Sequence, residues 1–386
     1  MISAGRMRVL FLSDYVSIHQ KAFCDAMYDA LKEKFTFMAT TRVSEARKQM
    51  GWSDYTAQVP YAVYNTDFSN GEIEKFVDGF DFIILGSSHE KRVNGVLRKK
   101  LVFYYQERPL KKGMKELLKP KRAWAILRMI LRQTKKTHLL AASAYCYVDY
   151  NKLGCFKNRA WKWGYFIKPI CEFYNPREGQ VAKILWVGRM IAWKHCEMMI
   201  ESARVLHRKG YEFQLDLIGG GEEEDKLKDI VKECGLTEKV NFLGKKSNEE
   251  VREYMKKSDI FVTTSDKREG WGVVINEAMS AGCCVVASDA MGAAPYLIRH
   301  QINGLLYESE NQHQLNDVLE GAIENKGLRE KLGKAALDTM NHTWSPGNAA
   351  KRVIALGEHL LDGGREECDG ENKNSPCSRA SSEISY

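Results

Sequence analysis

Residues 259–288 read DIFVTTSDKREGWGVVINEAMSAGCCVVAS, and this stretch decides the fold. It opens with an apolar run at 260–264 and closes with another at 284–288, each as long as a buried strand. Between them, 272–281 has helical spacing and follows a Gly-Trp-Gly turn. A helix between two nearly continuous apolar strands predicts a parallel sheet covered on both faces.

The same alternation runs outward in both directions. In the first half, strands are expected at 9–13, 35–40, 82–85, 101–105 and 138–142, with helices at about 19–33, 43–50, 71–78 and 111–132. In the second half, strands are expected at 183–187, 213–218, 240–243, 260–264 and 284–288, with helices at about 194–208, 223–234, 247–257, 272–281 and 311–340. Two such series predict two Rossmann-like, doubly wound α/β domains facing each other across a cleft.

The polar segment CEFYNPREGQ at 171–180 precedes a fresh strand, so the domains are expected at 1–170 and 171–345. Ser345 is a plausible N-cap with Pro346 at the first helical position, which predicts a closing helix over 346–362. The end, 363–386, is polar and poor in large apolar residues, which predicts a disordered tail.

The composition indicates a two-domain globular protein that stays in the cytoplasm. The chain has 386 residues, and none of its apolar stretches approaches the roughly 18 residues of a membrane-spanning helix. Its first apolar run is too short for a secretory signal. The ten cysteines contain no C-x-x-C pair, which favours reduced structural thiols.

Charge is distributed unevenly along the chain. The first 170 residues hold 30 Lys and Arg against 15 Asp and Glu, whereas the rest hold 28 against 35, and the whole has a net charge of +8. The basic half therefore suggests an anionic partner: nucleic acid, a membrane surface or a phosphate-bearing substrate.

Two glutamates bracket the start of the helix in the opening stretch. Glu269 lies in the loop after a strand, Gly270-Trp271-Gly272 leads into the helix, and Glu277 lies in its second turn. Ligands bind at the carboxyl ends of strands in such sheets, and a glycine-rich turn opening a helix presents backbone N–H groups to anions. A nucleotide diphosphate fits this arrangement, with Glu277 reaching the ribose; an acidic surface helix is the plainer alternative.

Cations and glycines follow the first two strands of the second half. WVGRMIAWKH places Gly188, Arg189 and Lys194 at a strand-to-helix turn, where the two cations would neutralise a departing diphosphate. LIGGGEEED places Gly219 and Gly221 at the next strand end, where the backbone either approaches a ligand or turns sharply.

Taken together, GRMIAWK, LIGGG, VNFLGKKSNEEVREYMKKSDIFVTTS, EGWGVVINEAMSAGCCVVAS and TWSPGNAAKR resemble glycosyltransferase family four, over about 182–350. The resemblance implies a retaining transferase with two Rossmann-like domains (the GT-B fold), the second of which binds the nucleotide sugar. It implies that Arg189 and Lys194 bind the donor diphosphate, Glu269 the donor sugar and Glu277 the ribose. It further implies that Gly244-Lys245-Lys246 lines the base pocket.

The first half is similar to a subset of bacterial cell-surface polysaccharide transferases, through SIHQKAFCDAM, YYQERPLKKG, LLAASAYCYVDYN and WGYFIKP. This similarity implies capsule, exopolysaccharide or lipopolysaccharide assembly and an acceptor bound by residues 1–170. His19 and His89, each after a strand, are candidates for moving protons or binding a sugar hydroxyl, with surface roles as the alternative. Glu107 and Arg108 are either acceptor contacts or a structural ion pair.

A basic amphipathic segment lies between Lys111 and Lys136, with ten Lys and Arg and a single acid, Glu116. Within it, Trp124, Leu127, Ile130 and Leu131 fall along one helical face. Interfacial membrane helices share this pattern, so peripheral contact with the inner face of the membrane is expected; a core-facing stripe is the alternative.

We therefore expect a glycosyltransferase that moves a sugar from a nucleotide diphosphate to a saccharide acceptor, lipid-linked in the favoured case. The sequence has no Asp-x-Asp, so no essential metal or cofactor is expected. Two alternatives are a sugar-nucleotide epimerase or phosphorylase on the same fold and a basic nucleic-acid-binding protein. The sequence has no recognition helix or aromatic RNA-binding motif, which argues against nucleic-acid binding. It also lacks G-x-G-x-x-G after the first strand, which argues against a dinucleotide oxidoreductase.

Overall fold

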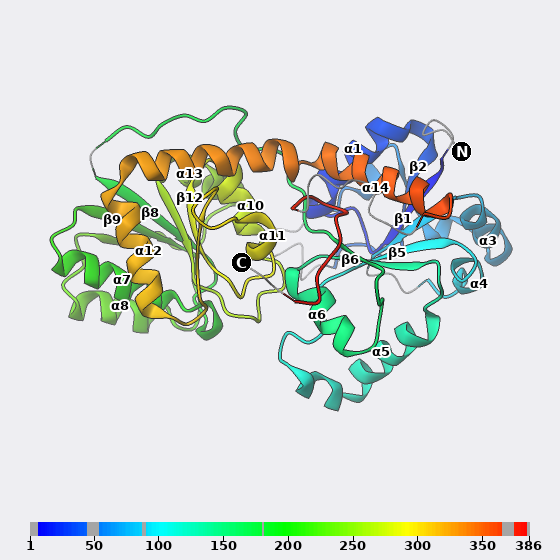
Figure 1. Cartoon of the computed structure of the whole chain (residues 1–386), viewed down its shortest axis with the longest axis horizontal. Coiled ribbons are helices and arrows are strands. Elements are labelled where there is room, and N and C mark those ends of the chain that lie inside the picture. Colours follow the sequence, from blue (N-terminus) through cyan, green and yellow to red (C-terminus); the bar gives the residue numbers. More distant parts are fainter. Residues whose placement is uncertain (1–6, 45–53, 87–89, 180, 365–373, 384–386) are drawn as a thin grey trace. The chain divides into compact units, whose positions relative to one another are not determined.

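The computed structural model describes residues 7–44, 54–86, 90–179, 181–364 and 374–383. The chain divides into two compact units (Figure 1). Unit 1 runs to Lys168 and resumes at Trp344, and unit 2 is the continuous segment from Pro169 to Thr343. The change from unit 1 to unit 2 after Lys168 lies beside the boundary expected at 170/171. The closing helix expected over 346–362 belongs to unit 1 and does not form a separate element.

Unit 1 contains a seven-stranded parallel sheet in the order β3-β2-β1-β4-β5-β6-β7. Its strands are β1 (Val9–Ser13), β2 (Phe35–Ala39), β3 (Ala62–Tyr64), β4 (Phe82–Leu85), β5 (Leu101–Gln106), β6 (Thr137–Ala141) and β7 (Ala160–Lys162). Its helices are α1 (Ile18–Leu31), α3 (Asn70–Asp78), α4 (Asn94–Leu97), α5 (Pro120–Arg132), α6 (Ala144–Lys152) and α14 (Pro346–Leu361). The strand order reverses direction between β1 and β4, which opens a crevice at their carboxyl ends.

Unit 2 contains a six-stranded parallel sheet in the order β10-β9-β8-β11-β12-β13. Its strands are β8 (Ala182–Val187), β9 (Phe213–Ile218), β10 (Val240–Phe242), β11 (Ile260–Thr263), β12 (Cys284–Ser288) and β13 (Leu305–Tyr307). Its helices are α7 (Cys196–Arg208), α8 (Glu224–Glu233), α9 (Asn248–Lys257), α10 (Val273–Ser280), α11 (Ala294–Leu297), α12 (Gln312–Glu324) and α13 (Lys326–Asp338). The reversal point lies between β8 and β11.

The buried strands explain why both sheets form. In unit 1, β1 and β4 are buried along their whole length, and in unit 2 so are β11 and β12. Strands with two covered faces have no polar face, which is why they appear in the sequence as continuous apolar runs. The expectation of two Rossmann-like domains is confirmed.

Three strands escaped the sequence analysis: β3, β7 and β13, each three residues long at or near a sheet edge. The helix expected over 311–340 is two helices, because Asn325 caps the second through its side chain, which accepts from the backbone N–H of Leu328 at 2.9 Å. The helix expected at 43–50 falls largely outside the described residues.

The nine cysteines within the described residues are all free thiols, and no helix in this part of the chain has the length and apolarity to cross a membrane.

The closing helix α14 packs on unit 1 beside α1 (Figure 1). Ser345 caps it, accepting from the backbone N–H of Asn348 at 3.2 Å, and Pro346 is its first residue as expected. Gly357 lies so close to β4 that a Cβ there would be 2.4 Å from the Phe82 ring. A side chain at 357 would therefore push the helix off the sheet.

The expected disordered tail is wrong for residues 374–383. This stretch, which we term the return segment, pairs with β7: Arg379 bridges Trp161 in antiparallel register, and the Ala380 N–H donates to the Ala160 carbonyl at 3.0 Å. The Arg379 guanidinium lies 4.1 Å from the centre of the Trp161 ring, and Cys377 is buried. Backbone hydrogen bonds and one aromatic contact hold it, so its polar composition gave no signal.

Deleting residues 374–386 should destabilise unit 1. The deletion removes three backbone hydrogen bonds to β7, each contributing about 1 kcal/mol, and uncovers Trp161. Thermal unfolding should show a midpoint lowered by several degrees. Truncation after Glu383 is the control and should leave the midpoint unchanged; equal midpoints for both truncations would contradict the packing described.

Candidate functional site

The loops at the carboxyl ends of β8 and β9 are joined through their glycines. Gly219 has φ +139°, and a Cβ on it would lie 1.8 Å from the Gly188 carbonyl oxygen. A Cβ on Gly221 would lie 2.2 Å from the Met190 carbonyl oxygen. Met190 N–H donates to the Gly220 carbonyl at 3.0 Å. The sequence left open an approach of the backbone to a ligand or a sharp turn; the structure shows that these glycines let the backbones of the two loops approach each other.

Lys194 and Glu269 meet at the reversal point of unit 2. Lys194 follows β8, Glu269 follows β11, and their side chains form an ion pair that is mostly buried, with 14% and 17% of each side chain exposed. Thr264 positions the lysine loop, because its hydroxyl donates to the Lys194 carbonyl at 2.6 Å and accepts from the Trp186 indole at 3.0 Å. The structure thus brings together two residues that the sequence placed 75 positions apart.

The turn before α10 is shaped by Gly272. This residue is the N-cap, with φ +92°, and a Cβ there would lie 2.4 Å from the Met291 side chain and 3.3 Å from that of Glu269. Glycine therefore lets the helix begin directly beside the glutamate. The first backbone N–H groups of α10 follow at this point, where they favour an anion.

The side chain of Trp271, a residue of the turn expected to bind the donor, is buried. The residue is 1% exposed, and its indole N–H donates to the Asn276 side chain at 2.8 Å. The large ring is part of the core because burying it stabilises the unit. Only the backbone of Trp271, and that of buried Gly270 beside it, remains for a ligand.

Glu277 projects from α10 and is held by Arg252 of α9, at 3.3 Å. Burial raises the pKa of this carboxyl above its usual range, although Arg252 lowers it in part. A mostly buried acid with a single cationic partner has acceptor capacity left for hydroxyl groups.

Arg189 and Lys245 are both exposed. Within the described residues, neither side chain has an ion pair or hydrogen bond. A Cβ on Gly220 would lie 3.6 Å from the Lys245 side chain, so this lysine reaches the glycine loops. Arg189 is not brought against Lys194 or Glu269.

His195 is a site residue that the sequence analysis missed. Its Nδ1 lies 2.9 Å from Glu197, and its Nε2 lies 3.6 Å from Asp266. The hydrogen bond to Glu197 raises the pKa of the imidazole, against the effect of burial. The clue was its position beside Lys194 in WKH; nothing in the sequence placed Asp266 opposite it.

With Glu310, His195 and Asp266 form the one three-residue group of potential metal ligands in the described ranges, with ligand atoms within 4.8 Å. Arg268 already donates to the Asp266 carboxylate at 2.9 Å through Nε and lies 2.8 Å from it through a terminal nitrogen. Because the Arg268 guanidinium already binds Asp266, its positive charge disfavours a metal ion there. The three residues are better suited to an imidazolium of His195 held by carboxylates than to a metal ion.

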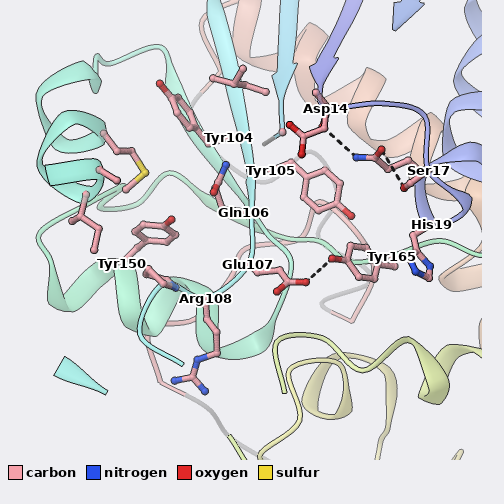
Figure 2. Close-up of a pocket in the computed structure, with 18 of the residues that line it drawn as sticks. Asp14, Ser17, His19, Tyr104, Tyr105, Gln106, Glu107, Arg108, Tyr150 and Tyr165 are labelled. Atoms are coloured by element: carbon pink, nitrogen blue, oxygen red, sulfur yellow. Dashed lines mark hydrogen bonds between the residues drawn. The ribbon is translucent and has the colours of Figure 1, made fainter. Parts of the chain in front are cut away.

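A cavity of about 580 Å³ opens at the reversal point of unit 1, between the ends of β1, β4 and β5 (Figure 2). His19 and Glu107, two of the candidate acceptor residues, both line it. Tyr165 connects them: its ring stacks on His19 at 5.5 Å, and its hydroxyl donates to the Glu107 carboxylate. Lys111 holds the other oxygen of Glu107.

Arg108 has a structural partner. It forms a buried two-point ion pair with Asp149, both contacts measuring 3.1 Å, and Asp149 also accepts from the Leu110 backbone N–H at 3.0 Å. This geometry favours the structural reading of Arg108 over acceptor contact. His89 lies outside the described residues.

Two further cavity residues, Asp14 and Tyr165, were not predicted. Asp14 directly follows β1 at the cavity wall (Figure 2). Its place after the first strand was a usable signal, because side chains at strand ends face the crevice. Tyr165 lies after β7, a strand too short to show in the sequence pattern.

Comparison with known proteins identifies unit 2. Residues 172–339 match the family of glycosyl transferases group 1. An uncharacterised glycosyltransferase of Haemophilus influenzae is 31% identical over 145 residues, covering 38% of this chain and 40% of that protein. The amylovoran biosynthesis glycosyltransferase AmsK of Erwinia amylovora is 34% identical over 145 residues, covering 36% and 35%. The chain thus spans well under half the length of these relatives.

Solved structures resemble the chain over both units. Anabaena HepE in complex with UDP has a TM-score of 0.66 at 16% identity, covering 92% of this chain and all of that one. The lipopolysaccharide outer core galactosyltransferase WaaB has a TM-score of 0.60 at 17% identity, covering 87% and 99%. Residues 172–339 therefore match the family of glycosyl transferases group 1, and the two Rossmann-like domains of the chain have the GT-B fold.

Proposed function

We propose that this protein is a retaining glycosyltransferase that takes a sugar from a nucleotide diphosphate. The observation that carries the proposal is the Lys194–Glu269 pair at the reversal point of a domain of this family, beside the N-terminus of α10. HepE, which shares the fold, was solved with UDP. An epimerase, a phosphorylase or a nucleic-acid-binding protein gains no specific support from the site.

In this proposal, Lys194 neutralises the charge that develops on the departing diphosphate, and Glu269 contacts the donor sugar. The glycine loops and the start of α10 supply backbone N–H groups for the phosphates. Arg189 is exposed and joins the site only when the diphosphate is bound. The acceptor hydroxyl attacks on the face that the diphosphate leaves, and a diphosphate oxygen receives its proton. Catalysis then rests on positioning and on charge stabilisation.

The acceptor binds unit 1, in the cavity around His19, Glu107 and Tyr165. Its polar groups suit sugar hydroxyls, and its volume lies in the range of small-molecule sites. The relatives AmsK and WaaB are named for amylovoran and lipopolysaccharide synthesis. We therefore place this protein in cell-surface polysaccharide assembly, such as that of capsule or lipopolysaccharide, with a saccharide acceptor.

The variants Lys194→Ala and Glu269→Gln should each lower turnover about 100- to 1,000-fold, because each removes one preorganised electrostatic contact. Turnover is measured with UDP-, GDP- and ADP-sugars, after a thermal-shift screen has found which nucleotide diphosphate raises the melting temperature. A nucleotide at 100 times its Kd adds about 2.7 kcal/mol of stability. Donor-dependent product should form only when an acceptor is present.

Lys209 and Glu320 provide the matched control. They also form a lysine–glutamate pair, at 2.7 Å. Lys209, however, is the C-cap of α7, which lies away from the carboxyl ends of the strands where Lys194 and Glu269 meet. Lys209→Ala and Glu320→Gln should retain full turnover. Normal turnover in either site variant would remove that residue from the mechanism, and a product of inverted anomeric configuration by NMR would exclude retention.

Activity should persist in EDTA. The proposal assigns the counter-charge of the diphosphate to Lys194, Arg189 and the α10 N-terminus, so no divalent cation is required. The measurement is the turnover rate with and without EDTA, using protein freed of metal beforehand. A loss of turnover that Mg²⁺ or Mn²⁺ restores would overturn this assignment.

We also propose that α5 lies on the inner surface of the cytoplasmic membrane. Its outer face, which we define as Trp124, Leu127, Ile130 and Leu131, is solvent-exposed, with Trp124 at 60% and Leu131 at 69%. These residues therefore do not form the core-facing stripe that was the alternative. Exposed Lys121, Lys135 and Lys136 flank the outer face, and Glu116, the single acid of the basic segment, is paired with Lys119 at 2.8 Å.

The protein should sediment with phosphatidylglycerol-containing vesicles at low salt and be released as salt rises, because each lysine near the lipid contributes about 1 kcal/mol and is screened beyond about 8 Å. Trp124→Ala with Leu131→Ala should weaken sedimentation at least tenfold, since both side chains lose apolar burial. The control Phe173→Ala with Ile302→Ala removes two exposed apolar side chains of unit 2 and should have no effect. A wild type that ignores the vesicles at low salt would exclude the membrane contact.

A further inference from the structure

Helix α5 presents three adjacent rows of side chains. At about 100° per residue, positions four apart stack in a row along the helix. Leu127 and Leu131 form a row on the outer face. Trp124, Arg128 and Arg132 form the next row, and Ala125 and Met129 form the third. The two arginines, which we term the arginine row, therefore lie between the outer face and the third row.

The third row lines two cavities. Ala125 and Met129 both border the 580 Å³ cavity of unit 1 and a smaller one of about 230 Å³. The two cavities also share Leu85, Tyr104 and Arg132, so they adjoin each other along α5. Arg128 borders the smaller cavity. On one side, the arginine row thus borders the smaller cavity, which adjoins the acceptor cavity. On its other side, it borders the outer face of α5.

The arginine row lacks a counter-charge. Within the described residues, neither Arg128 nor Arg132 has an acid partner; Arg128 lies 5.0 Å from the centre of the Trp124 ring. Burial lowers the pKa of Arg132, and nearby Arg128 and Arg98 lower it further. Glu90 borders the smaller cavity, but Arg92 holds it at 2.7 Å and Asn65 donates to it. Partly buried cations that repel one another are stabilised when an anion binds.

Resting on the proposed function, we infer that the arginine row binds the diphosphate of a lipid-linked acceptor. Guanidinium groups bind phosphate oxygens through paired hydrogen bonds. The lipid chain then lies with the outer face in the bilayer, the diphosphate lies at the arginine row, and the sugar enters the larger cavity beside Glu107 and Tyr165. Around α5, the outer face, the arginine row and the cavity side therefore follow one another in the same order as the apolar, anionic and polar parts of such a molecule.

Geranyl diphosphate in a nonionic detergent is the probe. Calorimetry measures its binding with saturating UDP present, so that the donor site does not bind the probe. Inorganic pyrophosphate and geraniol are the matched ligands, which lack the lipid and the diphosphate respectively. Wild type should bind geranyl diphosphate at least tenfold more tightly than either.

The variant Arg128→Gln with Arg132→Gln should lose at least tenfold in affinity for geranyl diphosphate, whereas its weak affinity for geraniol should stay unchanged. Lys152→Gln with Lys157→Gln removes the same charge from exposed positions of unit 1 that border neither cavity, and this variant should bind as wild type. If the double variant fails to fold, the single variants are measured, and each should show a smaller loss. Equal binding by the arginine variants and wild type, or an equal loss in the lysine control, would overturn the inference.

Pyrophosphate binding as tightly as geranyl diphosphate would also overturn it, because the lipid would then play no part. Lys209→Ala, outside both sites, should leave geranyl diphosphate binding unchanged. Failure of the proposed transferase activity would appear as loss of nucleotide binding, a separate measurement from the arginine dependence.

Discussion

The carbonyl oxygen of Gly188 occupies the space where a side chain on residue 219 would lie, and this exclusion sets the geometry of unit 2. Because both loops are bare backbone there, the ends of β8 and β9 close against each other, and the Gly219 N–H at the end of β9 donates to the Gly244 carbonyl. The β8 loop is then fixed at its start. Thr264 fixes it again at Lys194, and the ammonium group meets Glu269. Any side chain at 219 would move the loop and separate the charged pair.

The two charged centres of the protein differ in how they are balanced. In unit 2, Lys194 and Glu269 neutralise each other, so the pair is stable without a ligand although both groups are largely buried. In unit 1, neither arginine of the arginine row forms an ion pair with an acid within the described residues. When a ligand binds at the Lys194–Glu269 pair, each charged group exchanges its present partner for the ligand. When an anion binds at the arginine row, the arginines gain their first counter-charge.

Sequence patterns predicted the parts of this structure that depend on burial. The long central strands appeared as apolar runs, and Lys194 and Glu269 were predicted because they follow such strands. The patterns failed where backbone contacts decide: β3, β7, β13 and the return segment are held by edge pairing that leaves little trace in composition. They also failed where two loops meet, since Asp266 and Glu310, which lie near His195, come from distant parts of the chain.

The return of the chain to unit 1 affects the order in which the protein can be completed during synthesis. Unit 2 is continuous, so all its residues have been made once Thr343 has left the ribosome. Unit 1 begins first but still lacks α14, which covers β4, and the return segment, which covers β7. Domains generally fold from the N-terminus as they emerge. Here the first domain to emerge is finished after the second, and its sheet stays partly uncovered until α14 and the return segment have been made.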